Sequence, residues 1–433
     1  TTGHSNTALG AYSLDANTTG LANVAIGIYA LTAATTASDN TAMGYNALGN
    51  TTTGASNTAV GGSAMNSNTT GANNVATGWN ALYANTTGAR NTAVGYETMK
   101  ANITGQRNDA SGYGSLRTNT TGSYNTASGM ESMYSNTTGS YNAAFGYLSL
   151  FSNTTASNNT GTGYLALYSN TTGTLNTAFG RSTLTANTTG ASNTVVGAYA
   201  GDSLTSGSSN VVVGFEALST ETVYSENTAI GYRALKVNLG GYSNTSVGHE
   251  TMLANTTGAN NVAVGHDALT ANTTGAANVA VGNYSLDANT TGGANTAIGA
   301  YALGANTTAS NNTAIGSSAL EVNTTGTQNV AVGDNSLAGN TTASYNTAVG
   351  RQALSANTTG ANNTAVGYGA GASNLTGADN TYVGFGSGYS GTNYYNTAVG
   401  KYSLYNSTGA YNVAVGTNAL NANTTASNNT AVG

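Results

Sequence analysis

The chain has 433 residues, 6% of them charged where an average soluble protein has about 25%, and its formal net charge is −6. It has 59 glycines but no proline or cysteine, which excludes disulfide bonds and thiolate metal sites. Nine lysines and arginines spread over the whole length offer no basic patch to a nucleic acid, and no apolar stretch reaches the ~20 residues that cross a bilayer.

An Asn-x-small-x-Gly motif returns every 17 residues from Asn6 to Asn429, except for two 16-residue steps that end at Asn396 and Asn412. The glycine four residues after the asparagine is present in all 26 copies. A short fixed period indicates one structural unit stacked on itself. We therefore interpret residues 1–433 as a single continuous repeat array and expect it to be a segment of a longer fibre.

The first full coil, residues 6–22, defines the elements. We number its positions as columns 1 to 17, beginning at Asn6. Columns 1–5 and about 7–11 each have the length of a short strand, while Gly at column 5 and Asn-Thr-Thr-Gly at columns 12–15 favour turns. Seventeen residues are too few for a helical repeat. The pattern predicts an all-β parallel β-solenoid of about 25 coils with two short strands per coil.

Two columns are mainly apolar and never charged: column 4 in 22 of 26 copies, and column 9, which is Leu or Met in 22 of 25. Of the 24 charged residues, 22 fall in columns 6, 7, 10 and 17. We therefore expect columns 4 and 9 to face inward and to form ladders from coil to coil, together with the Asn and Gly columns. The first ladder residues are Asn6, Asn23, Asn40, Gly10, Gly27, Gly44, Leu14, Leu31 and Leu48.

Two regions depart from this pattern. Between residues 108 and 163, Ser111, Ser128 and Thr162 replace the column-4 aliphatic residue, so we expect the loosest coils there. Between residues 371 and 411, Gly371 and Gly388 replace the column-9 leucine and two coils lose a residue, which predicts a local bend or altered twist.

Column 12 supplies the Asn-x-Thr pattern that N-glycosylation requires, although the same residues suit a plain turn, which we favour. The candidate acceptors are Asn17, Asn68, Asn85, Asn119 and Asn136. The chain also has 27 tyrosines and one tryptophan, many of them in columns that take charges. We expect these aromatic residues to be exposed and to offer a contact face. Its candidate members are Tyr45, Trp79, Tyr96, Tyr113, Tyr147 and Tyr164.

No pattern points to catalysis or to a cofactor. His249 and His266 share column 6 in adjacent coils, but with Asp267 alone beside them we interpret them as surface residues and expect no metal site. No carboxylate pair is set up for acid–base chemistry, and no nucleophile motif or phosphate-binding loop is present. We expect the protein not to be an enzyme.

The units Asn-Thr-Ala-Val-Gly-Tyr-Glu-Thr-Met (91–99) and Asn-Val-Ala-Val-Gly-His-Asp-Ala-Leu (261–269) resemble the head repeats of trimeric autotransporter adhesins. The longer unit with Asn-Thr-Thr-Gly also resembles repeat arrays of tail-fibre-like proteins. The resemblance implies a left-handed β-roll, three chains side by side, and a place on a cell surface or in a virion fibre. The longer turn at columns 12–15 departs from the adhesin repeat.

These observations favour a structural extracellular fibre or filament protein that serves adhesion or presentation. Its expected partners are further copies of itself, in a homotrimer or in a head-to-tail filament, and host-surface carbohydrate or protein. The alternative is a binding module, because exposed tyrosine rows suit carbohydrate and threonine rows on a flat solenoid can order ice-like water.

Overall fold

The computed structural model describes residues 2–433, which divide into two compact units that meet in sequence between Glu216 and Ala217. Each unit contains 13 strands of three residues each, and no helix occurs among the described residues. The strands of the first unit are β1 (Thr7–Leu9), β2 (Val24–Ile26), β3 (Thr41–Met43), β4 (Thr58–Val60), β5 (Val75–Thr77), β6 (Thr92–Val94), β7 (Asp109–Ser111), β8 (Thr126–Ser128), β9 (Ala143–Phe145), β10 (Thr160–Thr162), β11 (Thr177–Phe179), β12 (Thr194–Val196) and β13 (Val211–Val213).

The strands of the second unit are β14 (Thr228–Ile230), β15 (Thr245–Val247), β16 (Val262–Val264), β17 (Val279–Val281), β18 (Thr296–Ile298), β19 (Thr313–Ile315), β20 (Val330–Val332), β21 (Thr347–Val349), β22 (Thr364–Val366), β23 (Thr381–Val383), β24 (Thr397–Val399), β25 (Val413–Val415) and β26 (Thr430–Val432).

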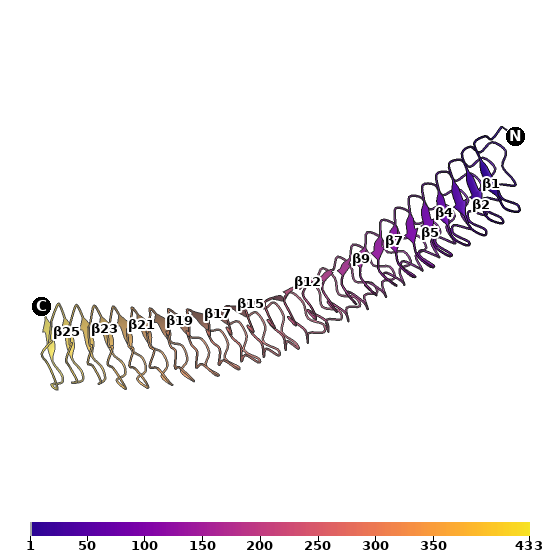
Figure 1. Cartoon of the computed structure of the whole chain (residues 1–433). Helices are drawn as coiled ribbons and strands as arrows, with labels where there is room; N and C mark the ends of the chain where they lie inside the picture. Colours follow the sequence, from indigo (N-terminus) through magenta and orange to yellow (C-terminus); the bar gives the residue numbers. More distant parts are fainter. Residues whose placement is uncertain (1) are drawn as a thin grey trace. The chain divides into compact units, whose positions relative to one another are not determined.

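Consecutive strands pair in parallel within each unit, so each coil lies on the next (Figure 1). The register is that of the repeat: Val262 pairs with Val279 and Ala263 with Ala280. The structure thus confirms the predicted parallel β-solenoid. The register also continues through the shortened coils, where Thr381 pairs with Thr397. The missing residue is therefore taken from the turn and not from the sheet.

The predicted second strand does not form. Columns 7 to 11 are turns in which the residues of columns 7 and 9 have left-handed backbone angles, such as φ 53° at Asp267 and φ 55° at Leu269. Hydrogen bonds between coils persist there, because Leu269 N–H donates to the Ser285 carbonyl at 2.9 Å. Each coil therefore has one strand, in columns 2–4, and returns through a turn that is bonded to its neighbours.

The columns that are buried in the structure differ from those that the sequence predicted. Ala263 in column 3 and Leu269 in column 9 are fully buried, whereas Val264 in column 4 is 36% exposed. Alternate residues of a strand face opposite sides, so a strand that buries column 3 must present columns 2 and 4 outward. The expectation that column 4 faces inward is wrong, and with it the reason for loose coils between 108 and 163: Leu116, Met133 and Leu150 remain fully buried there.

Two asparagine columns line the interior as well, together with the fully buried small residues of column 8, such as Ala268. In the coil that begins at Asn74, the side-chain amides of Asn74 and Asn85 both donate to the Gly88 carbonyl, at 2.9 and 3.0 Å. Each amide group also bonds to the next coil: Asn74 Oδ1 accepts from Asn91 N–H at 2.9 Å, and Asn85 Oδ1 accepts from Asn102 Nδ2 at 2.8 Å. Columns 1 and 12 therefore satisfy the polar groups of a turn that is closed to water.

The first ladder residues occupy these columns in the structure. Asn23, Asn40, Leu31 and Leu48 are fully buried, while Asn6 and Leu14 in the end coil are half-buried. The column-5 glycines Gly10, Gly27 and Gly44 have φ of 141°, 131° and 138°. A Cβ atom on Gly10 would also lie 2.6 Å from the Gly27 carbonyl oxygen. Glycine is required here both by the backbone angle and by the close approach of successive coils.

Candidate interaction surfaces

The column-4 residues form an exposed row that we call the outer apolar ridge. Val349, Val366, Val399 and Val415 are each 37 or 38% exposed, and Phe179 is 58% exposed. Column 2 of the same strands adds valines such as Val330, which is 37% exposed. No charged residue occupies column 4 in any coil. A mainly apolar row that is free of charge and faces solvent is a candidate interaction surface.

The six residues expected to form an aromatic contact face are exposed, each by 41 to 59%. They lie in column 6, and several stack on the same column of the next coil. Trp79 lies 5.3 Å from Tyr96, Tyr96 lies 5.2 Å from Tyr113, and Tyr147 lies 5.6 Å from Tyr164, between ring centroids. Successive coils are one strand spacing apart, so rings in one column meet face to face.

An aromatic groove of about 230 Å³ lies in the second unit, in the coils that follow β22 and β23. It is lined by the rings of Tyr368, Phe385, Tyr389, Tyr402 and Tyr405. Tyr368 stacks on Phe385 with 5.1 Å between ring centroids, and Tyr389 stacks on Tyr405 with 5.0 Å. Glycines at positions 369 and 386 also line the groove. A Cβ atom on Gly386 would come within 2.9 Å of the Tyr402 ring, so the missing side chains leave the groove open.

The candidate glycosylation sites are mostly inside the coil. Asn68, Asn85, Asn119 and Asn136 are fully buried, and the side-chain amide nitrogen of each donates both to a turn carbonyl and to a side chain of the preceding coil. Asn17, which lies in the first coil, is half-buried. A glycan on a buried amide nitrogen would break both bonds, so the folded coil favours the turn role of column 12.

The threonine hydroxyl groups of column 13 are engaged in hydrogen bonds within the protein. Thr69 Oγ1 donates to the Thr86 carbonyl at 3.0 Å, and Thr120 Oγ1 donates to the Thr137 carbonyl at 3.0 Å. These hydroxyl groups hold neighbouring coils together. They are therefore poorly placed to order a layer of water. Of the two threonine columns that suggested ice binding, 13 and 14, only column 14 is left to support it.

The pKa values of Glu97 and Glu221 are shifted in opposite directions. Glu97 pairs with Lys100 at 2.6 Å and Arg117 at 2.7 Å, and the hydrogen bond from Lys100, more than that from Arg117, lowers the pKa of its carboxyl below 4.5. Glu221 replaces the column-12 asparagine and is fully buried. Burial raises the pKa of Glu221, against the hydrogen bonds that it accepts from the N–H groups of residues 222–224 and from Asn238.

One further group, His249, His266 and Asp267, is the only set of His and acidic side chains in the described residues that is close enough to share a metal ion.

No described residue belongs to a helix with the length and hydropathy needed to cross a membrane. No protein-family model matches the chain, and no curated protein is found to be similar to it.

Proposed function

We propose that this chain is a non-enzymatic structural module of an extracellular fibre, and that it associates side by side with further copies of itself. The outer apolar ridge carries the proposal. A solenoid that needs only internal stability would place polar residues on its outer face, as the surface columns 6, 7, 10 and 17 do here. Column 4 instead keeps an apolar residue in 22 of 26 coils.

A second copy is the partner that fits the ridge best. Its side chains repeat at the strand spacing, roughly 4.8 Å, along each unit. A partner must match that spacing over many coils to bury the ridge, and another chain with the same repeat does so without adaptation. The resemblance to adhesin head repeats suggests three chains. A head-to-tail filament is the alternative arrangement, and attachment to a cell or virion surface is the expected setting.

The oligomeric state tests this proposal. We would replace Val264, Val281 and Ile298 by lysine and measure the mass of the native particle by analytical ultracentrifugation. The control carries Thr274→Lys, Thr291→Lys and Thr308→Lys, which place the same charges on the exposed column-14 turn of the same three coils. We expect the wild type and the control to form a defined oligomer and the ridge variant to be monomeric. A monomeric wild type, or equal masses for all three, contradicts the proposal.

The aromatic groove favours a second function, carbohydrate binding. Sugar rings present apolar faces that stack on exposed aromatic rings, and Tyr368, Tyr389 and Tyr405 supply hydroxyl groups beside those rings. A glycan array with the wild type, and with Phe385→Ala and Tyr389→Ala, tests this function. Tyr96→Ala is the matched control, because Tyr96 belongs to a stacked aromatic row that does not line the groove. Loss of a glycan signal in the groove variants but not in the control supports the function. Equal signals for the wild type and the groove variants exclude the groove as the glycan-binding site.

A further inference from the structure

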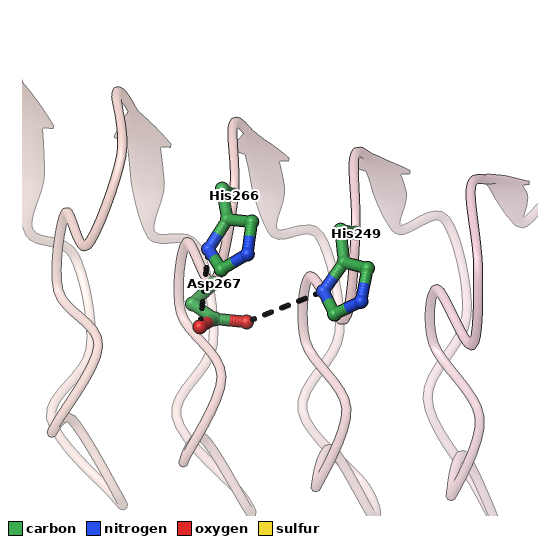
Figure 2. Close-up of side chains that lie close together, drawn as sticks. All are labelled: His249, His266 and Asp267. Carbon is green, nitrogen blue, oxygen red and sulfur yellow. Dashed lines mark ion pairs between the residues drawn. The ribbon is translucent and has the colours of Figure 1, made fainter.

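The histidine pair is built by two adjacent coils of the second unit. His249 follows Gly248 after β15, and His266 follows Gly265 after β16, so both occupy column 6. Their imidazole rings are parallel, with an interplanar angle of 2° and centroids 4.8 Å apart. Figure 2 shows Asp267, from the same coil as His266, with its carboxylate directed toward both rings. The three side chains therefore converge although they come from two coils.

Asp267 is close enough for a direct contact with one histidine but not with the other. Asp267 Oδ2 lies 3.1 Å from His266 Nδ1, and Asp267 Oδ1 lies 3.9 Å from His249 Nδ1. At 3.9 Å no hydrogen bond forms, and Oδ1 is buried without any hydrogen-bond partner. A buried carboxylate oxygen without a donor is costly, and it faces an imidazole nitrogen across a gap.

We propose that His249, His266 and Asp267 form a binding site for a divalent transition-metal ion, with zinc as the ion. Two imidazole nitrogens and one carboxylate oxygen are ligands that zinc accepts. Ligand atoms on a tetrahedral zinc ion with bonds of about 2.1 Å lie about 3.4 Å apart. The 3.1 Å separation is shorter than this value and the 3.9 Å separation is longer, and they end on different oxygens of Asp267. Because the two imidazole rings are stacked in parallel, the side chains must rotate to place one atom of each residue on a common ion.

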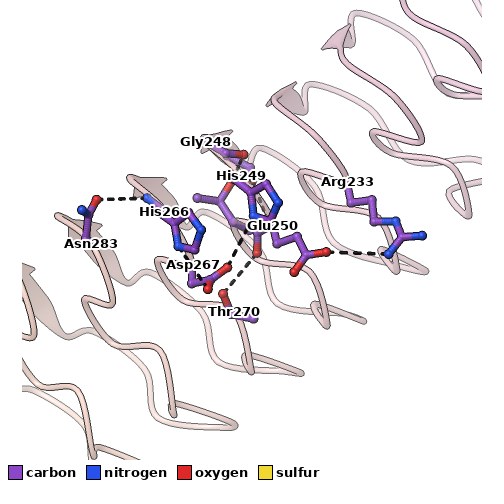
Figure 3. Close-up of polar contacts among 10 residues, drawn as sticks. Arg233, Gly248, His249, Glu250, His266, Asp267, Thr270 and Asn283 are labelled. Atoms are coloured by element: carbon purple, nitrogen blue, oxygen red, sulfur yellow. Dashed lines mark hydrogen bonds and ion pairs between the residues drawn. The ribbon is translucent and has the colours of Figure 1, made fainter.

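The surroundings define the site's limits (Figure 3). Glu250, the acidic residue next to His249, is directed away toward Arg233, with 3.7 Å between their charged atoms. Asn283 follows in the same column and accepts a hydrogen bond from the His266 backbone N–H at 3.3 Å. The Tyr232 ring stacks on His249 at 5.1 Å. The column therefore offers one site for one ion, bounded by an aromatic ring and an amide.

The backbone holds the two coils of this site together. Asp267 N–H donates to the His249 carbonyl at 3.0 Å, which keeps the main chain of the two residues at adjacent positions. Both imidazole side chains are nearly half exposed, at 46 and 45%, so an ion can enter from solvent and keep a water molecule as its fourth ligand. An ion held by both coils links residue 249 to residues 266 and 267 and opposes their separation.

Zinc titration by calorimetry at pH 7 tests the site on the full chain after chelator treatment. We expect one zinc ion per chain, an affinity reduced at least tenfold in His249→Ala and in His266→Ala, and a weaker affinity in Asp267→Asn. Column 6 carries alanine in other coils, so the histidine substitutions should not disturb folding. Glu250→Gln is the matched control, because it removes the same charge from the same column as Asp267, one coil away, and should bind like the wild type.

A second readout separates ligation from loss of charge. Zinc should slow amide exchange in the coils of β15 and β16 in the wild type and in Glu250→Gln, but not in the double variant His249→Ala/His266→Ala. Magnesium, which prefers oxygen ligands, should have no effect at the same concentration. Wild-type zinc affinity equal to that of the double variant, or equal protection in both, overturns the proposal.

Discussion

Tyr382 shows how one residue can alter the core of a coil without changing its register. It occupies column 3, which is alanine in most coils, and its side chain is almost fully buried. The space comes from Gly371 and Gly388, which replace the column-9 leucine in two successive coils. A Cβ atom on Gly371 would lie 2.7 Å from the Tyr382 ring, and one on Gly388 would overlap it. A tyrosine on one wall thus substitutes for two leucines on the other.

This exchange predicts strong coupling between the positions. Tyr382→Ala alone should lose about 3–5 kcal/mol of local stability through the cavity it leaves. Gly388→Leu alone should also destabilise, because the new side chain meets the ring. Combining Tyr382→Ala with Gly371→Leu and Gly388→Leu should recover most of the loss, since both glycines have φ near 60°, close to that of the column-9 leucines. Amide exchange in the coils of β22 to β24 measures this, and additive effects would refute the coupling.

The two perturbed glutamates predict pH effects of opposite sign. The folded-state pKa of Glu97 lies below 4.5, so its ion pairs stabilise the coil fully above pH 4.5 and are lost as the pH falls through the folded-state value. The folded-state pKa of Glu221 lies above 4.5. Its protonated form therefore favours folding fully below pH 4.5, and that contribution is lost as the pH rises through the folded-state value.

Amide exchange corrected for its intrinsic pH dependence measures both effects. Acidification from pH 7 to pH 4 should reduce protection around Glu97 and increase it around Glu221. Glu97→Gln and Glu221→Asn, the second of which restores the usual column-12 residue, should each remove the local pH dependence. A response of the same sign in both regions would contradict the assignment of the two pKa shifts.

At the scale of the element, the backbone angles of columns 7 and 9 explain why columns 7 to 11 form a turn and not a second strand. Residues in columns 7, 9 and 17 have positive φ, a conformation that β-branched side chains resist. In a chain rich in threonine and valine, no Val, Ile or Thr occupies any of these three columns. That absence is a signal in the sequence. It distinguishes column 9, which holds Leu, Met or Gly, from the strand column 4, where Val and Ile are frequent.

The same element-scale geometry changes the expected behaviour of residues 108–163. Ser111, Ser128 and Thr162 lie on the outer face, so they leave the core of those coils unchanged. We expect amide exchange in β7 to β10 to be as slow as in β4 to β6. Introducing a polar residue inward, as in Leu116→Ser, should accelerate exchange in its own coil, while Ser111→Val should not slow it. Faster exchange in the unaltered coils of β7 to β10 would show that the outer face does contribute to their stability.

At the scale of the molecule, the period of the repeat was enough to predict a parallel solenoid, because an identical unit of 17 residues can satisfy its backbone only by pairing with its own copies. The direction of the apolar columns could not be predicted in the same way. Val264 and Leu269 are both apolar and never replaced by charge in other coils, yet one lies outside and one inside. Hydrophobicity alone does not distinguish a core residue from an apolar residue that faces outward.

The proposed self-association should therefore respond to salt as an apolar contact does. The chain has few charges, its net charge is −6, and no charged residue occupies column 4, while Asp109 is the one charged residue in column 2 of the same face. Raising sodium chloride from 50 to 500 mM should leave the oligomer intact, because there is little charge attraction to screen, and ammonium sulfate should strengthen it. Sedimentation velocity across this series measures the oligomer fraction. A contact made instead by the charged columns 6, 7, 10 and 17 would weaken as sodium chloride is added, and dissociation at 500 mM would move the interface from the ridge to those columns.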